Sequence, residues 1–296
     1  MTVLAPTSLD DALALLVDDP SALVLGGGTD VMVQVNEGMR RFDRVIALGA
    51  IPELRLREVR DGYFFLGAGV TYTELMAPEV AAHAPALAAA ARTVGSPQIR
   101  NAGTIGGNLG TASPAGDTLP VLRALGASVE IAGPADPGSG PADPGSGSAP
   151  RRVEPLGDFL TGPKQTVLRP GELIVGVRVP LRRGPQEYLK VGVRNAMVIA
   201  VASLALVLDL DRLSVGVGLG SVGPVVLDAP EASTWLADRL RWLPERALLD
   251  DRRIGDEFAA MVAAAARPID DHRSGAAYRR HAVEVMARRA LRRCTA

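Results

Sequence analysis

The chain has 296 residues, of which 47% are hydrophobic and 22% are charged, and its 32 basic and 33 acidic side chains leave a net charge of −1. This length is enough to bury a sizeable core and to form two domains. The near-neutral balance gives no electrostatic footprint for nucleic acid or an anionic membrane, so we expect neither as a partner. No apolar run approaches the length of a membrane span. The N-terminal stretch has acidic residues and no basic start, so we expect a cytoplasmic protein without a secretory signal.

Cysteine and histidine are too scarce for a metal centre on this chain. The one cysteine, Cys294, excludes an internal disulfide and a cysteine-ligated iron–sulfur cluster. The three histidines show no zinc-type spacing. We therefore predict no metal site, and a redox function would need an organic cofactor here and any metal centre on a partner chain.

The N-terminal segment predicts a helix, a strand and a glycine turn. Ser8 can cap a helix that has leucines on one face. The apolar run from Ala22 to Leu25 predicts a buried strand, three glycines and Thr29 follow, and Asp30 opens a second helical pattern. A strand, a glycine turn and a helix start form a common anion site, although the spacing is not that of a Rossmann fold. Residues 23–30 therefore predict a phosphate cradle, and a tight turn without a ligand is the alternative.

The following elements alternate between strands and helices. We predict strands at 44–48 and 63–66 from their apolar, β-branched and aromatic content. Thr71 and Glu74 have the spacing of a capping box, which explains this motif without a catalytic role. An alanine-rich pattern predicts one helix from Pro78 to about Val94.

The stretch from Thr93 to Pro120, TVGSPQIRNAGTIGGNLGTASPAGDTLP, predicts polar turns. Its paired glycines leave backbone N–H groups accessible, so a ligand can approach closely. Several side chains add hydrogen-bonding groups at short range, and these are Thr104, Asn108, Thr111, Ser113 and Asp117. Such a stretch suits a large, flat, polar ligand such as a phosphorylated cofactor. A glycine-rich crossover without a ligand is the alternative, because short glycine motifs carry a high false-positive rate.

The sequence after Pro120 predicts a helical run, a strand at 128–131 and then a direct repeat. PADPGSG occurs at 134–140 and again at 141–147. This composition cannot form a packed core, so we expect a flexible surface insertion at 133–150 within a hairpin. A neutral expansion is the first interpretation of this insertion, and a regulatory or partner-binding role is the alternative.

The last third of the chain has a different pattern. A strand at 172–179 ends at a proline, and the domain boundary is expected near 170–180. Alternating or apolar runs then predict an antiparallel sheet, and their ranges are 188–193, 198–210 and 213–219. Three helices follow, at 229–240, 255–266 and 275–293.

No hydrolytic motif is present, and we predict no catalytic residue. There is no G-x-S-x-G, no H-E-x-x-H and no histidine placed to serve Cys294. Asp270 and Asp271 are adjacent, and neighbouring side chains generally point apart. We expect them to be loop carboxylates that pair with Arg273 or Arg279.

Six segments in order resemble the FAD-binding subunit of the molybdenum hydroxylases, which include bacterial xanthine dehydrogenases and carbon monoxide dehydrogenases. They are LVLGGGTD (23–30), GAGVTYTEL (67–75), QIRNAGTIGGN (98–108), ASPAGD (112–117), KVGVRN (190–195) and ARPIDDHRSGAAYRRH (266–281). The resemblance implies an α+β fold. Residues 1–175 would form an FAD-binding domain of the PCMH or vanillyl-alcohol-oxidase type, with subdomains at about 1–55 and 56–175. Residues 176–296 would form a C-terminal domain of antiparallel sheet plus helices.

The resemblance also implies FAD as the cofactor and assigns residues to it. Residues 23–30 would hold the pyrophosphate, and 104–108 would line the other side. Asp117 would bond a ribose or ribityl hydroxyl, with a helix N-cap as the alternative. Lys190 would stabilise negative charge on reduced flavin, with a surface lysine as the alternative. The predicted set is Leu23, Val24, Leu25, Gly26, Gly27, Gly28, Thr29, Asp30, Val94, Thr104, Ile105, Gly106, Gly107, Asn108, Thr111, Ser113, Asp117, Ile174 and Lys190; Val94 and Ile174 are explained equally well as core.

The function implied by the resemblance is an electron relay within a complex. A molybdopterin large subunit would oxidise the substrate with water, and a [2Fe–2S] small subunit would pass the electrons on. The FAD of this chain would deliver them to NAD or another acceptor. A xanthine dehydrogenase-like complex is the first interpretation and a carbon monoxide dehydrogenase-like one the second. A self-sufficient flavin oxidoreductase and a cofactor-free assembly module are the alternatives from other classes.

Overall fold

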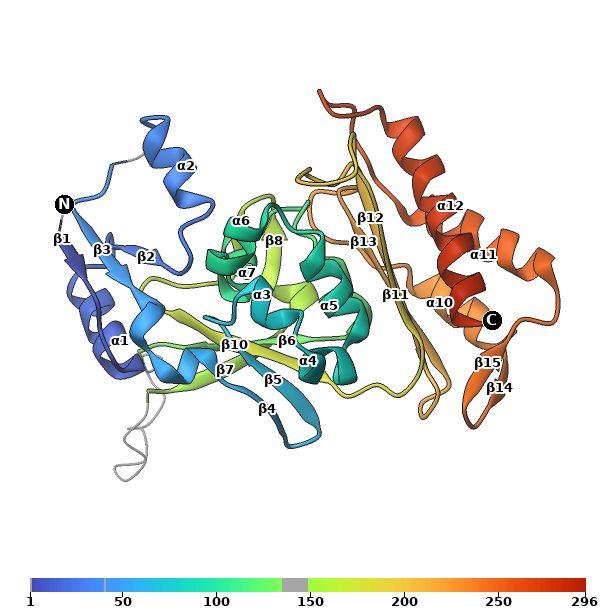
Figure 1. The fold of residues 1–296 in the computed structure, drawn as a ribbon, viewed down its shortest axis with the longest axis horizontal. Helices are drawn as coiled ribbons and strands as arrows, with labels where there is room; N and C mark the ends of the chain where they lie inside the picture. The colour runs from blue at the N-terminus through green and yellow to red at the C-terminus, as the bar shows by residue number, and fades with distance from the viewer. Residues whose placement is uncertain (1, 40, 135–148) are drawn as a thin grey trace.

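The computed structural model describes residues 2–39, 41–134 and 149–296. The chain forms three parts that follow one another along its longest axis (Figure 1). Strands in separate sheets and helices packed on them give a mixed α+β architecture, as predicted.

The N-terminal part is a small parallel sheet with two helices. Its strands pair in the order β1-β3-β2. The elements are β1 (Thr2–Leu4), α1 (Leu9–Asp18), β2 (Leu23–Leu25), α2 (Val31–Asn36) and β3 (Arg44–Ala47), followed by the 3-10 helices η1 (Leu48–Ala50) and η2 (Pro52–Arg55). The predicted cap of α1 is confirmed, since Ser8 Oγ accepts the N–H of Asp11 at 3.1 Å.

The central part is a five-stranded antiparallel sheet in the order β4-β5-β10-β6-β7. Its strands are β4 (Arg57–Arg60), β5 (Tyr63–Gly67), β6 (Ser128–Ala132), β7 (Arg151–Pro155) and β10 (Leu173–Pro180). Helices α3 to α7 lie along one face of this sheet (Figure 1). They are α3 (Tyr72–Leu75), α4 (Pro78–His83), α5 (Pro85–Arg92), α6 (Pro97–Ala102) and α7 (Ile105–Thr111); α8 (Leu119–Leu125), α9 (Leu156–Phe159) and the short strands β8 (Leu160–Gly162) and β9 (Gln165–Thr166) complete the part.

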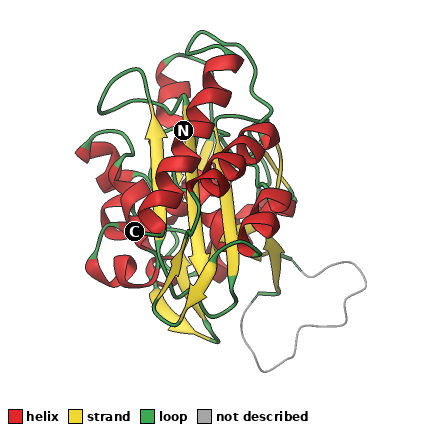
Figure 2. Cartoon of the chain, turned by 90° about the vertical axis from the view of Figure 1, so that its right-hand side faces the viewer, coloured by secondary structure: helices red, strands yellow, loops and turns green. Residues whose placement is uncertain are grey.

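The C-terminal part is an antiparallel sheet in the order β11-β12-β13, with helices in front of its strands when it is viewed from that end (Figure 2). Its elements are β11 (Gln186–Val191), β12 (Ala202–Asp209), β13 (Ser214–Gly220), α10 (Pro230–Ala237), β14 (Arg241–Leu243), β15 (Arg246–Leu248), α11 (Arg252–Ala265) and α12 (Ala276–Cys294). The predicted sheet and its three helices are therefore present, with small shifts of their ends.

Alternate glycines of β13 connect the C-terminal sheet to the central part. A Cβ at Gly216 would lie 2.0 Å from the carbonyl oxygen of Ala124, and one at Gly218 would lie 1.8 Å from that of Pro120. Both carbonyls belong to α8. The strand therefore packs directly on the backbone of α8, and any side chain at these glycines would push the helix away.

Two predictions about helices are wrong. The single helix from Pro78 to Val94 is two helices, α4 and α5, because Pro85 lacks an N–H group and Ala84 has left the helical conformation, with φ −143°. The stretch 97–111, predicted as turns, forms α6 and α7. Glycine disfavours a helix, but the cap and the packing described below override this preference.

The strands on both sides of the predicted insertion pair as a hairpin would require. Ser128 faces Pro155 and Ala132 faces Arg151 in the β6–β7 register. Residues 135–148, which hold most of the repeat, lie outside the described residues. Among the helices of the described ranges, none is both long enough and apolar enough to span a membrane.

Candidate functional site

The predicted glycine turn lies against the beginning of α7. A Cβ at Gly26 would lie 3.1 Å from Thr104 Oγ1, and one at Gly27 would lie only 1.7 Å from the carbonyl oxygen of Ala102. Gly28 has φ +72°, a conformation that glycine adopts most readily. The structure thus brings together two predicted segments, 23–30 and 104–108, although about eighty residues of sequence separate them.

The packing also supplies a structural reason for two of these glycines. Beyond the contact at Gly27, a Cβ at Gly106 would lie 2.5 Å from the Cβ of Ala68. Both positions must therefore stay small whether or not a ligand binds. The bare glycines consequently do not discriminate between a cofactor site and a fold that has lost one, and that distinction must rest on other residues.

The N-terminus of α7 is capped by a predicted site residue. Thr104 is buried, and its Oγ1 accepts the N–H of Gly107 at 3.0 Å. This bond satisfies one of the backbone donors that every helix N-terminus leaves unpaired. Gly107, on the same turn, is exposed, so its backbone can be approached by a ligand.

The other end of α7 connects to the loop 111–117. The hydroxyl of Thr118 donates to Asn108 Oδ1 at 2.5 Å, and Ser113 Oγ accepts the N–H of Ala115 at 3.3 Å. Thr111 lies at the C-terminal end of α7 and is partly exposed. These predicted residues therefore follow one another along a single helix and the loop that leaves it.

The most unusual feature of the site is a buried ion pair. Lys190 Nζ lies 2.6 Å from Asp117 Oδ2, with side-chain exposures of only 9% and 8%. The Tyr188 hydroxyl donates to Asp117 Oδ1 at 3.0 Å, and Lys190 Nζ also donates to the carbonyl of Thr93 at 3.2 Å. These four residues, Thr93, Asp117, Tyr188 and Lys190, are called the charged cluster below.

Burial dominates the electrostatics of the charged cluster. It raises the pKa of Asp117, and Lys190, Tyr188 and Thr93 offset only part of that effect. Burial, with the Asp117 carboxylate next, also raises the pKa of Tyr188 well above its usual value, so Tyr188 is a neutral donor. Two bonds occupy the Lys190 ammonium, which leaves one of its three N–H donors for a ligand.

The structure excludes the alternative interpretations of Asp117 as a helix N-cap and of Lys190 as a surface lysine. The N-cap of α8 is Thr118, not Asp117. Lys190 is not a surface lysine, since its side chain is nearly buried. Asp117 and Lys190 are therefore partners of each other, although 73 positions separate them in the sequence.

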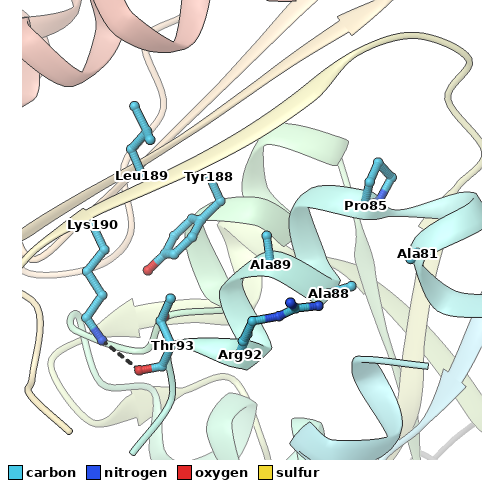
Figure 3. A pocket seen from close by; sticks show the side chains of 9 residues that line it. All are labelled: Ala81, Pro85, Ala88, Ala89, Arg92, Thr93, Tyr188, Leu189 and Lys190. Carbon is cyan, nitrogen blue, oxygen red and sulfur yellow. Dashed lines mark hydrogen bonds between the residues drawn. The ribbon is translucent and has the colours of Figure 1, made fainter. Parts of the chain in front are cut away.

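A groove of about 440 Å³ between α5 and β11 reaches the charged cluster (Figure 3). Alanines of α4 and α5 form most of one wall, and Arg92, Thr93 and Lys190 contribute polar groups. The dashed line in Figure 3 marks the bond from Lys190 to the Thr93 carbonyl. The cluster is thus buried yet accessible from one side.

The remaining predicted residues have more ordinary surroundings. Ile174 is buried in β10 and belongs to the central core, and Val94 is partly buried against the same core. Asp30 is exposed and its Oδ2 accepts a bond from Gln34 at 2.8 Å. Leu23, Val24 and Leu25 form β2. For these positions, as for Ile105 within α7, contact with a cofactor stays a prediction.

Sequence reasoning missed two members of the charged cluster, Thr93 and Tyr188. Tyr188 could have been found, because it lies two residues before Lys190 in a predicted strand and alternate strand residues share a face. Nothing in the sequence near Thr93 indicates that its backbone carbonyl would meet a lysine.

Outside the charged cluster, the potential metal-ligating side chains of the described residues form no metal centre. Burial raises the pKa of Cys294 to about 12, so its thiol stays neutral. No group of three or more His, Cys, Asp or Glu residues within the described ranges could hold a metal ion. Asp271 pairs with Arg279, which is one of the two partners predicted for it.

Comparison with known proteins identifies the class of protein that this fold and site represent. Residues 1–182 match the family model "FAD binding domain in molybdopterin dehydrogenase", and residues 187–294 match "CO dehydrogenase flavoprotein C-terminal domain". The chain therefore belongs to the flavoprotein subunits of the molybdenum hydroxylases. It is an oxidoreductase subunit whose cofactor is FAD.

Individual relatives support this membership over most of the chain. The xanthine dehydrogenase FAD-binding subunit of Escherichia coli O157:H7 is 31% identical over 212 residues, which cover 69% of this chain and 67% of that protein. The carbon monoxide dehydrogenase medium chain of Afipia carboxidovorans is 28% identical over 98% of this chain and 95% of its own length. A solved CO dehydrogenase from Oligotropha carboxidovorans, described as reconstituted, superposes with a TM-score of 0.83 at 27% identity, covering 100% of this chain and 97% of that chain.

Proposed function

We propose that this chain is the electron-transfer subunit of a molybdenum hydroxylase complex. It takes electrons from a [2Fe–2S] small subunit, which receives them from a molybdopterin large subunit, and passes them to NAD or another acceptor. Relatives described as medium chains support assembly with further subunits. A xanthine dehydrogenase-like complex remains the first choice. A carbon monoxide dehydrogenase-like complex is the second, supported by the alignment with that medium chain over nearly the whole length.

The observation that carries this proposal is the buried Asp117–Lys190 pair. Removing two charges from water costs several kcal/mol each, and such pairs are seldom better for stability than apolar side chains. A buried carboxylate whose pKa is raised, as for Asp117, and which a groove reaches is a candidate for a functional site. The pair is therefore poorly explained by a role in folding alone, and this argues against a cofactor-free assembly module.

The residues present fit FAD. The exposed backbone at Gly26 suits the pyrophosphate, and the Asp117 carboxylate keeps acceptor capacity for a ribityl or ribose hydroxyl. The remaining N–H of Lys190 would hold negative charge at the edge of the ring system. When bound, FAD supplies the electron chemistry, while these side chains orient it and keep water from its buried side.

We also propose a domain division. The predicted boundary at 175/176 falls inside β10, which pairs with β5 and β6 of the central sheet. We place the end of the FAD-binding domain at Pro180 and the start of the C-terminal domain at Gln186, the first residue of β11. The parallel sheet and the central sheet correspond to subdomains 1–55 and 56–180. Cytoplasmic location stays a prediction.

Anaerobic reduction of the flavin tests this relay against its alternative. The purified complex and the separated chain are each mixed with xanthine, an aldehyde or carbon monoxide, and bleaching of the flavin absorbance is followed. Reduction in the complex and none in the separated chain supports the relay. Turnover of one of these substrates by the chain alone would instead establish a self-sufficient flavin oxidoreductase.

A further inference from the structure

Arg279 of α12 is a buried cation outside the charged cluster. It is only 4% exposed, its Nη2 lies 2.5 Å from Asp271 Oδ1, and its Nη1 donates to the carbonyl of Ser221 at 2.7 Å. The same Asp271 oxygen accepts the N–H groups of Arg273 and Ser274, at 2.8 and 3.1 Å. These backbone bonds, together with the guanidinium, lower the pKa of Asp271 to about 2, so the carboxylate is ionised at neutral pH.

Ser221 connects this ionic anchor to the predicted cofactor loop. Its carbonyl is held by Arg279, and its N–H donates to the carbonyl of Pro114 at 2.8 Å. Pro114 lies between Ser113 and Asp117. Ser221 is 6% exposed and has φ +61°, a left-handed conformation that is unfavourable for serine. A strained conformation persists only where its surroundings hold it. Here it is held by the two hydrogen bonds of the Ser221 backbone, one from the Arg279 guanidinium and one to the carbonyl of Pro114.

The connection from Asp271 through Arg279 and Ser221 to Pro114 does not have the contacts expected if it served only the stability of the fold. Arg279 Nε and Ser221 Oγ are buried and have no hydrogen-bond partner within the described residues. Unpaired buried polar atoms are costly, and a buried ion pair is a weak source of stability. The connection also ends on the loop 113–117, within which Gly116 donates its N–H to the carbonyl of Ser113 at 2.9 Å and accepts the N–H of Leu119 at 3.2 Å.

We propose that Arg279 is a positioning residue for FAD, acting through Ser221 on the loop 113–117. Asp271 fixes the guanidinium, the guanidinium fixes the Ser221 carbonyl, and the Ser221 N–H fixes Pro114. The loop is thereby held so that Asp117 can meet both Lys190 and the cofactor. This inference rests on the proposed function of that loop, but it adds a determinant that lies on the last helix and touches no predicted cofactor residue directly.

Substitution of Arg279 by lysine tests the proposal. Arg279→Lys keeps the charge beside Asp271 but cannot donate from one rigid fork to both Asp271 and Ser221. Arg288→Lys is the matched control, because Arg288 lies on the same helix and is 45% exposed. FAD affinity is measured by fluorescence titration, and the visible circular dichroism of the bound flavin reports its orientation. We expect the dissociation constant for FAD to rise about tenfold in Arg279→Lys, with an altered dichroism spectrum and no such change in the control.

The outcomes separate this inference from the proposed function. A folded Arg279→Lys chain that binds FAD within twofold of the wild type, with the same dichroism, would overturn the positioning role. A wild-type chain that takes up no FAD, alone or with its partner subunits, would instead overturn the proposed function.

Hydrogen exchange on the wild-type chain gives an answer even if the variant does not fold. Coupling between sites is reciprocal, so FAD must in turn protect the Ser221 amide. We expect FAD to slow its exchange about tenfold while amides within α11 stay unchanged. Equal exchange with and without FAD would refute the connection.

Discussion

The charged cluster gives a prediction that separates binding from folding. Replacing Lys190 by methionine keeps a side chain of similar length but leaves the Asp117 carboxylate buried without its cation. Breaking one side of a buried pair costs about 3–5 kcal/mol, and we expect the free energy of unfolding of the cofactor-free protein to fall by that amount. The double variant Lys190→Met with Asp117→Asn removes both charges, and an asparagine oxygen can still accept from Tyr188. Its unfolding free energy should return to within about 1 kcal/mol of the wild type.

The affinity for FAD should not return in the double variant. A hydrogen bond to a charged group is worth about 1.5–3 kcal/mol, so losing the Lys190 contact should weaken FAD binding about 10- to 150-fold in both variants. Urea unfolding of the cofactor-free proteins gives the stabilities, and fluorescence titration with FAD gives the affinities. The reasoning fails if the double variant binds FAD as tightly as the wild type. It also fails if the double variant unfolds as easily as the single one, since the pair would then serve folding.

Three further predictions concern the surroundings of the site. In Gly218→Ala the new Cβ would lie 1.8 Å from the carbonyl oxygen of Pro120, and the two atoms must separate to at least 3.0 Å. The substitution should therefore displace α8, lower the free energy of unfolding in urea by about 1–3 kcal/mol and weaken FAD binding. Gly49→Ala is the control, because no atom lies within 4 Å of its Cβ, and it should change neither the unfolding free energy nor the FAD affinity. Thr104→Val removes the cap of α7 and should cost about 1 kcal/mol in urea unfolding; an unchanged midpoint would show that the cap is dispensable. Asp271 has a folded-state pKa of about 2, below the ordinary 3.8. Its contribution to stability is therefore complete above about pH 4 and is lost as the pH falls towards 2. The stability difference between the wild type and Asp271→Asn should shrink over that range, and a constant difference would contradict the assignment.

Local rules predicted the elements that local contacts decide. The Ser8 cap forms, and so does the capping box, in which Thr71 Oγ1 accepts the N–H of Glu74 at 3.2 Å and the Glu74 carboxylate accepts the N–H of Thr71 at 2.8 Å. Each bond joins residues three apart, so spacing alone reveals it. The break at Pro85 was also visible in the sequence, and the prediction of one long helix overlooked it.

Long-range contacts decided what the sequence could not reveal. Helix α7 forms in spite of its glycines because Gly106 packs on Ala68 and Thr104 caps its start, and only the first of these contacts is distant in sequence. The resemblance placed Asp117 and Lys190 at the cofactor separately. Their direct pairing follows from β11 lying beside α5, which no sequence pattern indicated.

The central claim is that this chain holds FAD, and an absorption spectrum of the purified full chain tests it most directly. The account predicts the bands of oxidised flavin, and FAD in the supernatant after heat release. A colourless chain that takes up FAD on addition would agree with the account and show that partner subunits help to retain the cofactor. A colourless chain that takes up no added FAD, alone or with its partner subunits, would contradict the account.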